Sequence, residues 1–152
     1  MGPYSAYKRN ELESASPEGI MLKLFEGAVV RLKQAQMEYA EGNVLQAREL
    51  RSRALAIISE LDNTLDRENA DQRLVDELDA LYAYMIRELT KSTMKDDFQA
   101  LTPVIETLNT LYQAFEEAVR QSKTSEQLVD SADMQRAAAT IPSDDKQVEM
   151  HG

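Results

Sequence analysis

The sequence predicts an all-α protein: an antiparallel up-down four-helix bundle with an N-terminal aromatic arm and a flexible acidic C-terminal tail. Four segments repeat apolar residues at helical spacing, and only 5 Gly and 4 Pro interrupt the 152 residues. Loops of a few residues separate these segments, which favours antiparallel neighbours. We therefore divide the chain into the arm (1–16), the bundle (17–122) and a mostly disordered tail (123–152).

The first helix has a clear start signal. Ser16 stands where an N-cap belongs, Pro17 takes the first helical position and Glu18 lies in the first turn. Gly42 closes the segment. Its apolar stripe comprises Met21, Phe25, Ala28, Leu32, Ala35 and Tyr39.

The second and third helices also carry one stripe each. Asn43, followed three residues later by Gln46, predicts a capping box at the start of the second helix. The third helix is expected to begin near Asn69 or Asp71. The stripe of the second helix is Ala47, Leu50, Ala54, Ile57 and Leu61, and that of the third is Leu74, Leu78, Leu81, Met85 and Leu89.

Pro103 interrupts the fourth apolar stripe, which otherwise has the clearest pattern. Proline inside a helix loses a hydrogen bond and clashes with the preceding turn. We expect either a short turn over residues 94–101 followed by the main helix from about 103, or a kink. The stripe comprises Phe98, Leu101, Ile105, Leu108, Tyr112, Phe115 and Val119.

The composition changes near residue 123. The tail is rich in Ser, Asp, Thr and Gln and has few large apolar residues, so it offers little surface to bury. We expect at most a turn or two of helix around residues 126–139.

The net charge and the residue types argue against nucleic-acid binding, metal binding and catalysis. The net charge is −10 without a basic block, which disfavours nucleic acid and anionic lipid as partners. The chain has no Cys, and its single histidine is His151, so we expect no metal site, no cofactor and no catalytic residue. Residues 1–19 lack an apolar leader, and no apolar stretch could span a membrane. We expect a cytoplasmic protein that is not an enzyme.

The helices carry more apolar residues than one stripe each requires. One interpretation is that helices in a bundle bury stripes wider than the minimum. The other is an apolar groove that receives an amphipathic helix from a partner. The residues predicted to line this groove are Leu55, Ile58, Leu65, Tyr82, Ile86, Val104 and Leu111.

Two tyrosines, Tyr4 and Tyr7, lie on the arm, ahead of any helical pattern. An aromatic arm folded over an apolar groove would protect it from aggregation, so we predict that these tyrosines plug the groove. The alternative is that they anchor the arm to its own bundle.

Several stretches together resemble the flagellar secretion chaperone family, FliS. Residues 7–10 (YKRN), 15–17 (ASP) and 22–28 (LKLFEGA) are similar to the opening of that family. Residues 78–89 (LDALYAYMIREL) are similar to its Leu-Tyr-x-Tyr-Met signature on the third helix. Residues 96–118 (DDFQALTPVIETLNTLYQAFEEA) are similar to its last main helix.

The resemblance covers about residues 4–120, with some departures. Phe25 and Glu26 replace the family's Tyr and Asp, and Gly19 stands where a larger residue is usual. Phe115 replaces a frequent Trp, and Pro103 is atypical. The tail is longer than usual, and the resemblance says nothing about it.

The resemblance implies a cytoplasmic chaperone that binds the C-terminal helical segment of flagellin, prevents its premature polymerisation and keeps it competent for flagellar type III export. It also implies transfer of the cargo to the cytoplasmic domain of the export gate. A homodimer of the cargo-free protein is a further expectation. The alternative function is that of a helical adaptor for another amphipathic partner helix.

Overall fold

The structure is a computed structural model that describes residues 16–140, with side chains for residues 16–122. The described residues are helical and contain no strand, as predicted. The arm with Tyr4 and Tyr7, and residues 141–152, lie outside the described residues. The helices are α2 (Pro17–Ala40), α3 (Val44–Asn63), α4 (Gln72–Lys95), the 3₁₀ turn η1 (Gln99–Leu101) and α5 (Thr102–Thr140).

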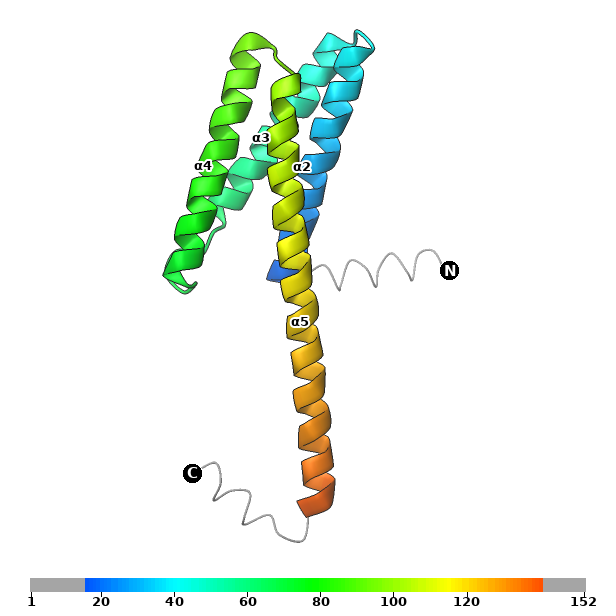
Figure 1. The fold of residues 1–152 in the computed structure, drawn as a ribbon, viewed down its shortest axis with the longest axis vertical. Helices are drawn as coiled ribbons and strands as arrows, with labels where there is room; N and C mark the ends of the chain where they lie inside the picture. Colours follow the sequence, from blue (N-terminus) through cyan, green and yellow to red (C-terminus); the bar gives the residue numbers. More distant parts are fainter. Residues whose placement is uncertain (1–15, 141–152) are drawn as a thin grey trace. The chain divides into compact units, whose positions relative to one another are not determined.

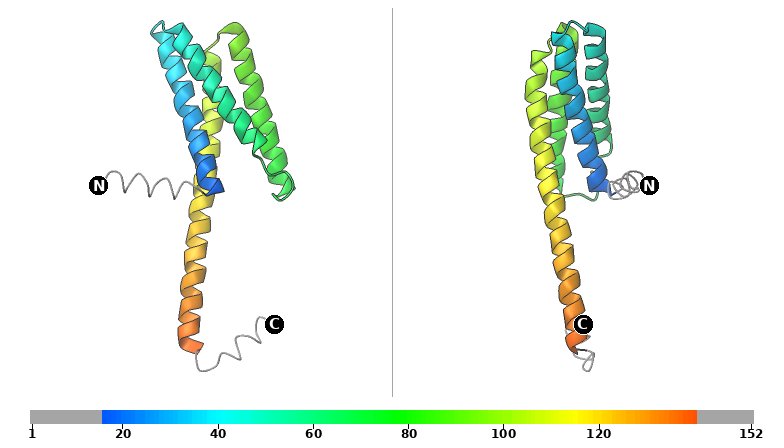
Figure 2. Two further views of the ribbon diagram at one scale, coloured as in Figure 1. Left: turned by 180° about the vertical axis from the view of Figure 1, so that it is seen from behind. Right: turned by 90° about the vertical axis from the view of Figure 1, so that its right-hand side faces the viewer.

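The chain divides into two compact units, and the boundary lies within α5: the first unit ends at Phe115 and the second begins at Glu116. In the first unit α2, α3, α4 and the first part of α5 alternate in direction, which gives the predicted antiparallel bundle (Figure 1). Figure 2 shows from behind how α3 crosses obliquely between α2 and α4.

The start of α2 is confirmed. The Ser16 hydroxyl accepts the backbone N–H of Gly19 at 3.1 Å, and Pro17 occupies the first turn, where its missing N–H costs no helical hydrogen bond. The helix ends at Ala40, and Gly42 follows with a φ of 87°, a left-handed conformation that glycine adopts without strain.

The capping box predicted for α3 is wrong, although Asn43 does occupy the N-cap position. The side chain makes no capping hydrogen bond; its Nδ2 donates to the Glu38 carboxylate at 2.7 Å instead. The hydrogen bond to the carboxylate is charge-assisted, and it orients the Asn43 side chain toward Glu38. At the start of α4, Asp71 is the N-cap and accepts the N–H of Arg73 at 2.9 Å.

The core draws on all four helices, but α4 is turned relative to its predicted stripe. Leu74 is 43% exposed, whereas Val75 and Tyr82, outside that stripe, are buried. Because α4 carries apolar residues on more than one face, its neighbours decide which face is buried. The largest fully buried apolar side chains are Phe25, Leu32, Ile58, Leu61, Val75, Tyr82, Met85, Leu89, Leu101, Val104 and Leu108.

The connection between α4 and α5 resolves the alternatives at Pro103. The helix α4 ends at Lys95, Asp96 adopts a left-handed conformation with φ 51°, and η1 precedes α5. Pro103 is the second residue of α5, where a helix tolerates proline. The first alternative, a short turn before the main helix, is therefore confirmed.

In the second unit, α5 continues to Thr140. This corrects the expectation of a mostly disordered tail from residue 123, for the part up to residue 140. The stretch has few large apolar residues, yet its Gln, Glu, Met, Arg and Ala residues have high helix propensity. A composition that cannot form a core can still form a helix.

Candidate functional site

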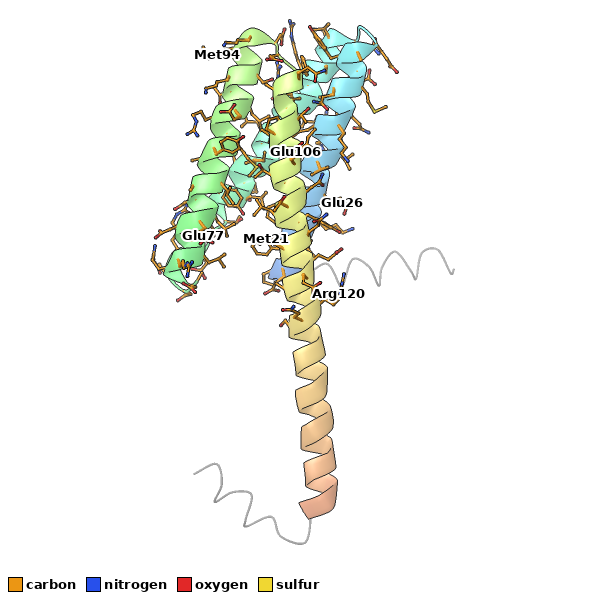
Figure 3. The ribbon with its side chains drawn as sticks, viewed as in Figure 1. Met21, Glu26, Glu77, Met94, Glu106 and Arg120 are labelled. Atoms are coloured by element: carbon orange, nitrogen blue, oxygen red, sulfur yellow. The ribbon has the colours of Figure 1, made fainter. Side chains whose placement is uncertain are left out.

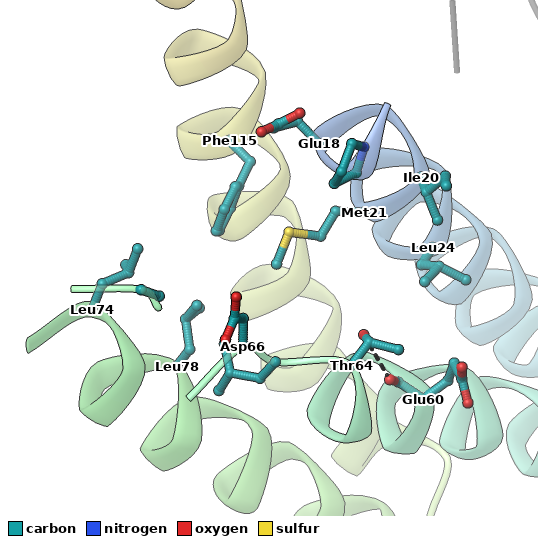
Figure 4. Close-up of a pocket in the computed structure, with 13 residues that line it drawn as sticks. Glu18, Ile20, Met21, Leu24, Glu60, Thr64, Asp66, Leu74, Leu78 and Phe115 are labelled. Atoms are coloured by element: carbon teal, nitrogen blue, oxygen red, sulfur yellow. Dashed lines mark hydrogen bonds between the residues drawn. The ribbon is translucent and has the colours of Figure 1, made fainter. Parts of the chain in front are cut away.

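An apolar pocket of about 540 Å³ opens at the end of the bundle where α2 begins, α3 ends and α4 begins. Figure 4 shows Met21 and Leu24 of α2, Leu74 and Leu78 of α4, and Phe115 of α5 around it. The apolar lining residues are Pro17, Ile20, Met21, Leu24, Leu65, Ala70, Leu74, Leu78 and Phe115.

The edge of the pocket presents apolar side chains to solvent. Ile20 is 49% exposed and Leu74 is 43% exposed, whereas the Phe25 ring is fully buried. The rings of Phe25 and Phe115 contact each other with their centres 5.5 Å apart. Apolar surface that remains exposed beside a concave site is a usual mark of a docking surface.

The loop between α3 and α4 is held by its own hydrogen bonds. The Asp66 carboxylate accepts the N–H groups of Asn69 at 3.1 Å and Glu68 at 3.2 Å. These amide hydrogen bonds lower the pKa of Asp66, and the one from Asn69 has the largest effect. Asp66 therefore stays ionised at neutral pH. Leu65 and Ala70, on either side of this ordered turn, line the pocket.

The charged residues that line the pocket are all acidic: Glu18, Glu60 and Asp66. The nearby Arg67 is engaged elsewhere, because it binds Asp62 at 2.9 Å and Asp79 at 2.5 Å. The pocket therefore combines an apolar interior with a negative edge.

The groove predicted from the sequence is not an open surface in this structure. Four of its residues, Ile58, Tyr82, Val104 and Leu111, are buried in the core. Bundle helices bury wide stripes, and here the additional apolar residues fill the space between the four helices. The burial of these four residues is what the wider-stripe interpretation expects.

The other three predicted groove residues are partly buried and lie apart. Leu65 lines the pocket at the end of the bundle. Leu55 lines a smaller, more polar pocket of about 330 Å³, together with Arg48 and Arg51. Ile86 packs against the core. Only Leu65 belongs to the apolar pocket, and whether any of the seven contacts cargo stays a prediction.

Sequence reasoning missed Ile20, Met21, Leu24 and Leu74 as pocket residues. Met21 and Leu74 were assigned to core stripes, because their spacing matches the helical repeat. The available signal was position: all four lie within about two turns of a helix start, where a bundle can open.

Tyr82 has an unusual environment. Its side chain is fully buried, and its hydroxyl has no hydrogen-bond partner in the part of the chain that the structure describes. Burial, with a smaller contribution from the negative charge of Asp62, raises the pKa of Tyr82 to about 12. The hydroxyl is therefore neutral at physiological pH.

Among residues 16–122, no group of three or more acidic or histidine side chains could hold a metal ion. Within residues 16–140, none of the helices has an apolar stretch of the length that a membrane span requires. An exposed apolar pocket on a helical bundle is a usual mark of a surface that docks an apolar segment of a partner.

The comparison with known families agrees with a helical, partner-binding protein and gives the particular family. The model of the family "Flagellar protein FliS" matches residues 1–122, and the chain belongs to that family. Relatives of this family are described as flagellar secretion chaperones, which makes it a family of export chaperones and not of enzymes.

Three relatives illustrate the similarity. The flagellar secretion chaperone FliS of Vibrio cholerae is 32% identical over 120 residues, covering 76% of this chain and 88% of the relative. That of Salmonella typhimurium is 33% identical over 105 residues, covering 68% and 77%. That of Bacillus subtilis is 27% identical over 121 residues, covering 80% and 89%.

Proposed function

We propose that this protein binds the C-terminal helical segment of flagellin in the bacterial cytosol. Binding covers the apolar face of that segment, prevents premature polymerisation and keeps the subunit competent for flagellar type III export. The observation that carries the proposal is the apolar pocket between Ile20, Leu65, Leu74 and Phe115, open at one end of the bundle. Membership of the FliS family supports the same role.

The pocket is concave and mostly apolar, which suits the apolar side chains of a partner helix. Its volume of about 540 Å³ lies in the range of small-molecule pockets, so it would receive anchoring side chains and not a whole helix. Burying a leucine-sized side chain contributes roughly 1.5–3 kcal/mol, so a few anchoring side chains suffice for stable binding. A partner helix laid along this end would cover the exposed Ile20 and Leu74 side chains.

We propose that the arm competes for the same pocket. Residues 1–15 lead directly into Ser16, and the next two residues, Pro17 and Glu18, line the pocket. We propose that Tyr4 and Tyr7 occupy the pocket in the absence of cargo and leave it when cargo binds. Release of cargo would follow contact with the cytoplasmic domain of the export gate, and a homodimer would be another way to cover the pocket when cargo is absent.

The test is co-expression of the chain with flagellin that carries or lacks its C-terminal segment, followed by affinity purification through the chaperone. Full-length flagellin is expected to co-purify, and the truncated form is not. Equal recovery of both forms would contradict binding of the C-terminal segment. Recovery of neither, together with a different helical protein, would favour an adaptor for another cargo.

A further inference from the structure

The apolar pocket carries negative charge that no group of the described residues neutralises. Glu18 comes from the first turn of α2, Glu60 from the last turns of α3, and Asp66 from the loop that follows. Figure 4 shows the Asp66 carboxylate beside Met21 and the Glu18 carboxylate toward Phe115, and both residues line the pocket. Three separate parts of the chain thus bring acidic groups to one apolar site.

The nearby cations do not balance these acids. No Lys or Arg lines the pocket, and within residues 16–122 the carboxylates of Glu18 and Glu60 form no hydrogen bond or ion pair. Arg67 is held by Asp62 and Asp79, and Arg73 pairs with Glu77 at 3.5 Å. Asp66 accepts two backbone N–H groups, which are neutral donors.

An acidic edge around an apolar pocket discriminates between partners by charge. A cationic side chain on the partner gains attraction from Glu18, Glu60 and Asp66 as its apolar neighbours enter the pocket. An acidic side chain at the same place meets repulsion, because like charges brought together raise the free energy of the complex. The apolar interior by itself makes no such distinction.

We propose that the pocket selects a cargo helix that carries Lys or Arg side chains directly beside its apolar face. This inference rests on the proposed function, since it assigns a chemistry to the segment that the pocket binds. The apolar face provides the buried area, and the basic side chains pair with the acidic edge and set the orientation of the helix.

The test uses two synthetic amphipathic peptides of about twenty residues, long enough to form a helix. They share one leucine-rich face, and its neighbouring positions carry Lys in one peptide and Glu in the other. Binding to the full chain is measured by calorimetry at low and high salt. The Lys peptide should bind about tenfold more tightly than the Glu peptide at low salt, and the difference should shrink at high salt.

Two matched double variants distinguish the effect of the charges at the pocket from the effect of the overall charge of −10. Glu18→Gln with Glu60→Gln removes two charges at the pocket, whereas Glu26→Gln with Glu106→Gln removes two exposed charges from residues that do not line it. Figure 3 labels Glu26 and Glu106 on α2 and α5. The first pair should weaken binding of the Lys peptide about fivefold, and the second by less than twofold. Circular dichroism checks that both variants remain folded.

Equal weakening by both pairs would overturn the inference, because the effect would then come from net charge. Equal affinity for the two peptides would also overturn it. The flagellin C-terminal segment is measured alongside the peptides. If that segment binds and is insensitive to Glu18→Gln with Glu60→Gln, the charge selection fails and the proposed function stands. If only the Lys peptide binds, the charge selection stands and the proposed cargo fails.

Discussion

The guanidinium carbon of Arg51 lies 4.3 Å from the centre of the Phe98 ring. The Tyr39 ring also stacks on Phe98, with the two centres 4.4 Å apart. Arg51 belongs to α3, Tyr39 to α2 and Phe98 to the connection between α4 and α5. The same guanidinium donates to the Ser92 carbonyl at 3.2 Å and to Asp96 at 2.9 Å. This end of the bundle, near the labelled Met94 in Figure 3, is therefore held by several polar contacts.

Arg51→Ala is expected to destabilise the protein by about 3 kcal/mol, because it leaves buried hydrogen-bonding groups without their partner. Arg51 is only 3% exposed. Urea denaturation measures the effect. The control is Arg53→Ala, whose exposed ion pair with Glu49 should matter little. If the two variants are equally stable, the contacts of Arg51 do not contribute as described.

Asp96 makes stability depend on pH in the acid range. Hydrogen bonds from Arg48 and then Arg51 lower its pKa from 3.8 to about 2. Because the folded pKa is below the unfolded one, the stabilisation is present above about pH 4 and is lost as the pH falls toward 2. Asp96→Asn keeps a residue that tolerates the left-handed φ of 51° and cannot ionise.

Urea titrations of the wild type and Asp96→Asn, from pH 5 to pH 2, test this prediction. The wild type should be more stable at pH 5, and the difference should diminish toward pH 2. A difference that stays constant across this range would show that the Asp96 carboxylate does not titrate as the contacts require.

Tyr82→Phe is expected to leave stability unchanged or to raise it by up to about 2 kcal/mol, because it removes a buried hydroxyl without a partner. The folded pKa of Tyr82 is raised from 10.0 to about 12, so the wild type should lose stability as the pH rises above 10. Tyr82→Phe should lose less than the wild type over that range. Thermal melting at pH 8 and pH 11 measures both effects. Clear destabilisation at pH 8 would reveal a hydrogen-bond partner for the hydroxyl.

Leu74→Asp is expected to weaken flagellin binding at least tenfold while the protein stays folded, since Leu74 is 43% exposed at the pocket. Ile58→Asp should instead unfold much of the protein, because Ile58 is fully buried. Leu45→Asp, which changes a residue 78% exposed outside the pocket, is the control. Co-purification and circular dichroism report binding and folding. Normal binding by Leu74→Asp would contradict the assignment of the pocket.

Deleting residues 1–8 is expected to increase binding of a hydrophobic dye or self-association, because it removes Tyr4 and Tyr7 from a chain with an exposed apolar pocket. Each ring contributes on the order of 1–2 kcal/mol when buried. Cargo should bind more tightly if the arm only competes, and less tightly if it also clamps the cargo. If dye binding, self-association and affinity all stay unchanged, the tyrosines are anchors.

Local sequence features predict the four helices and several of their ends. Ser16 and Pro17 predict the start of α2, and the rule that proline belongs in a first turn accounts for Pro103 at the start of α5. These are local effects. Each depends on hydrogen bonds and backbone angles within a few residues, so the residue types in that short stretch are enough to predict it. The resemblance to the FliS family was likewise carried by short local motifs.

Which apolar residues form the core and which line the pocket depends on how the helices pack against one another. Ile58 and Tyr82 were predicted for a groove and are buried, whereas Leu74 was predicted for the core and is exposed. Spacing along a helix shows that a residue is on an apolar face, but burial depends on the rotation of that helix and on where its neighbours end. The pocket exists because α2, α3 and α4 leave Ile20 and Leu74 uncovered at one end of the bundle, and that relation joins residues far apart in the chain.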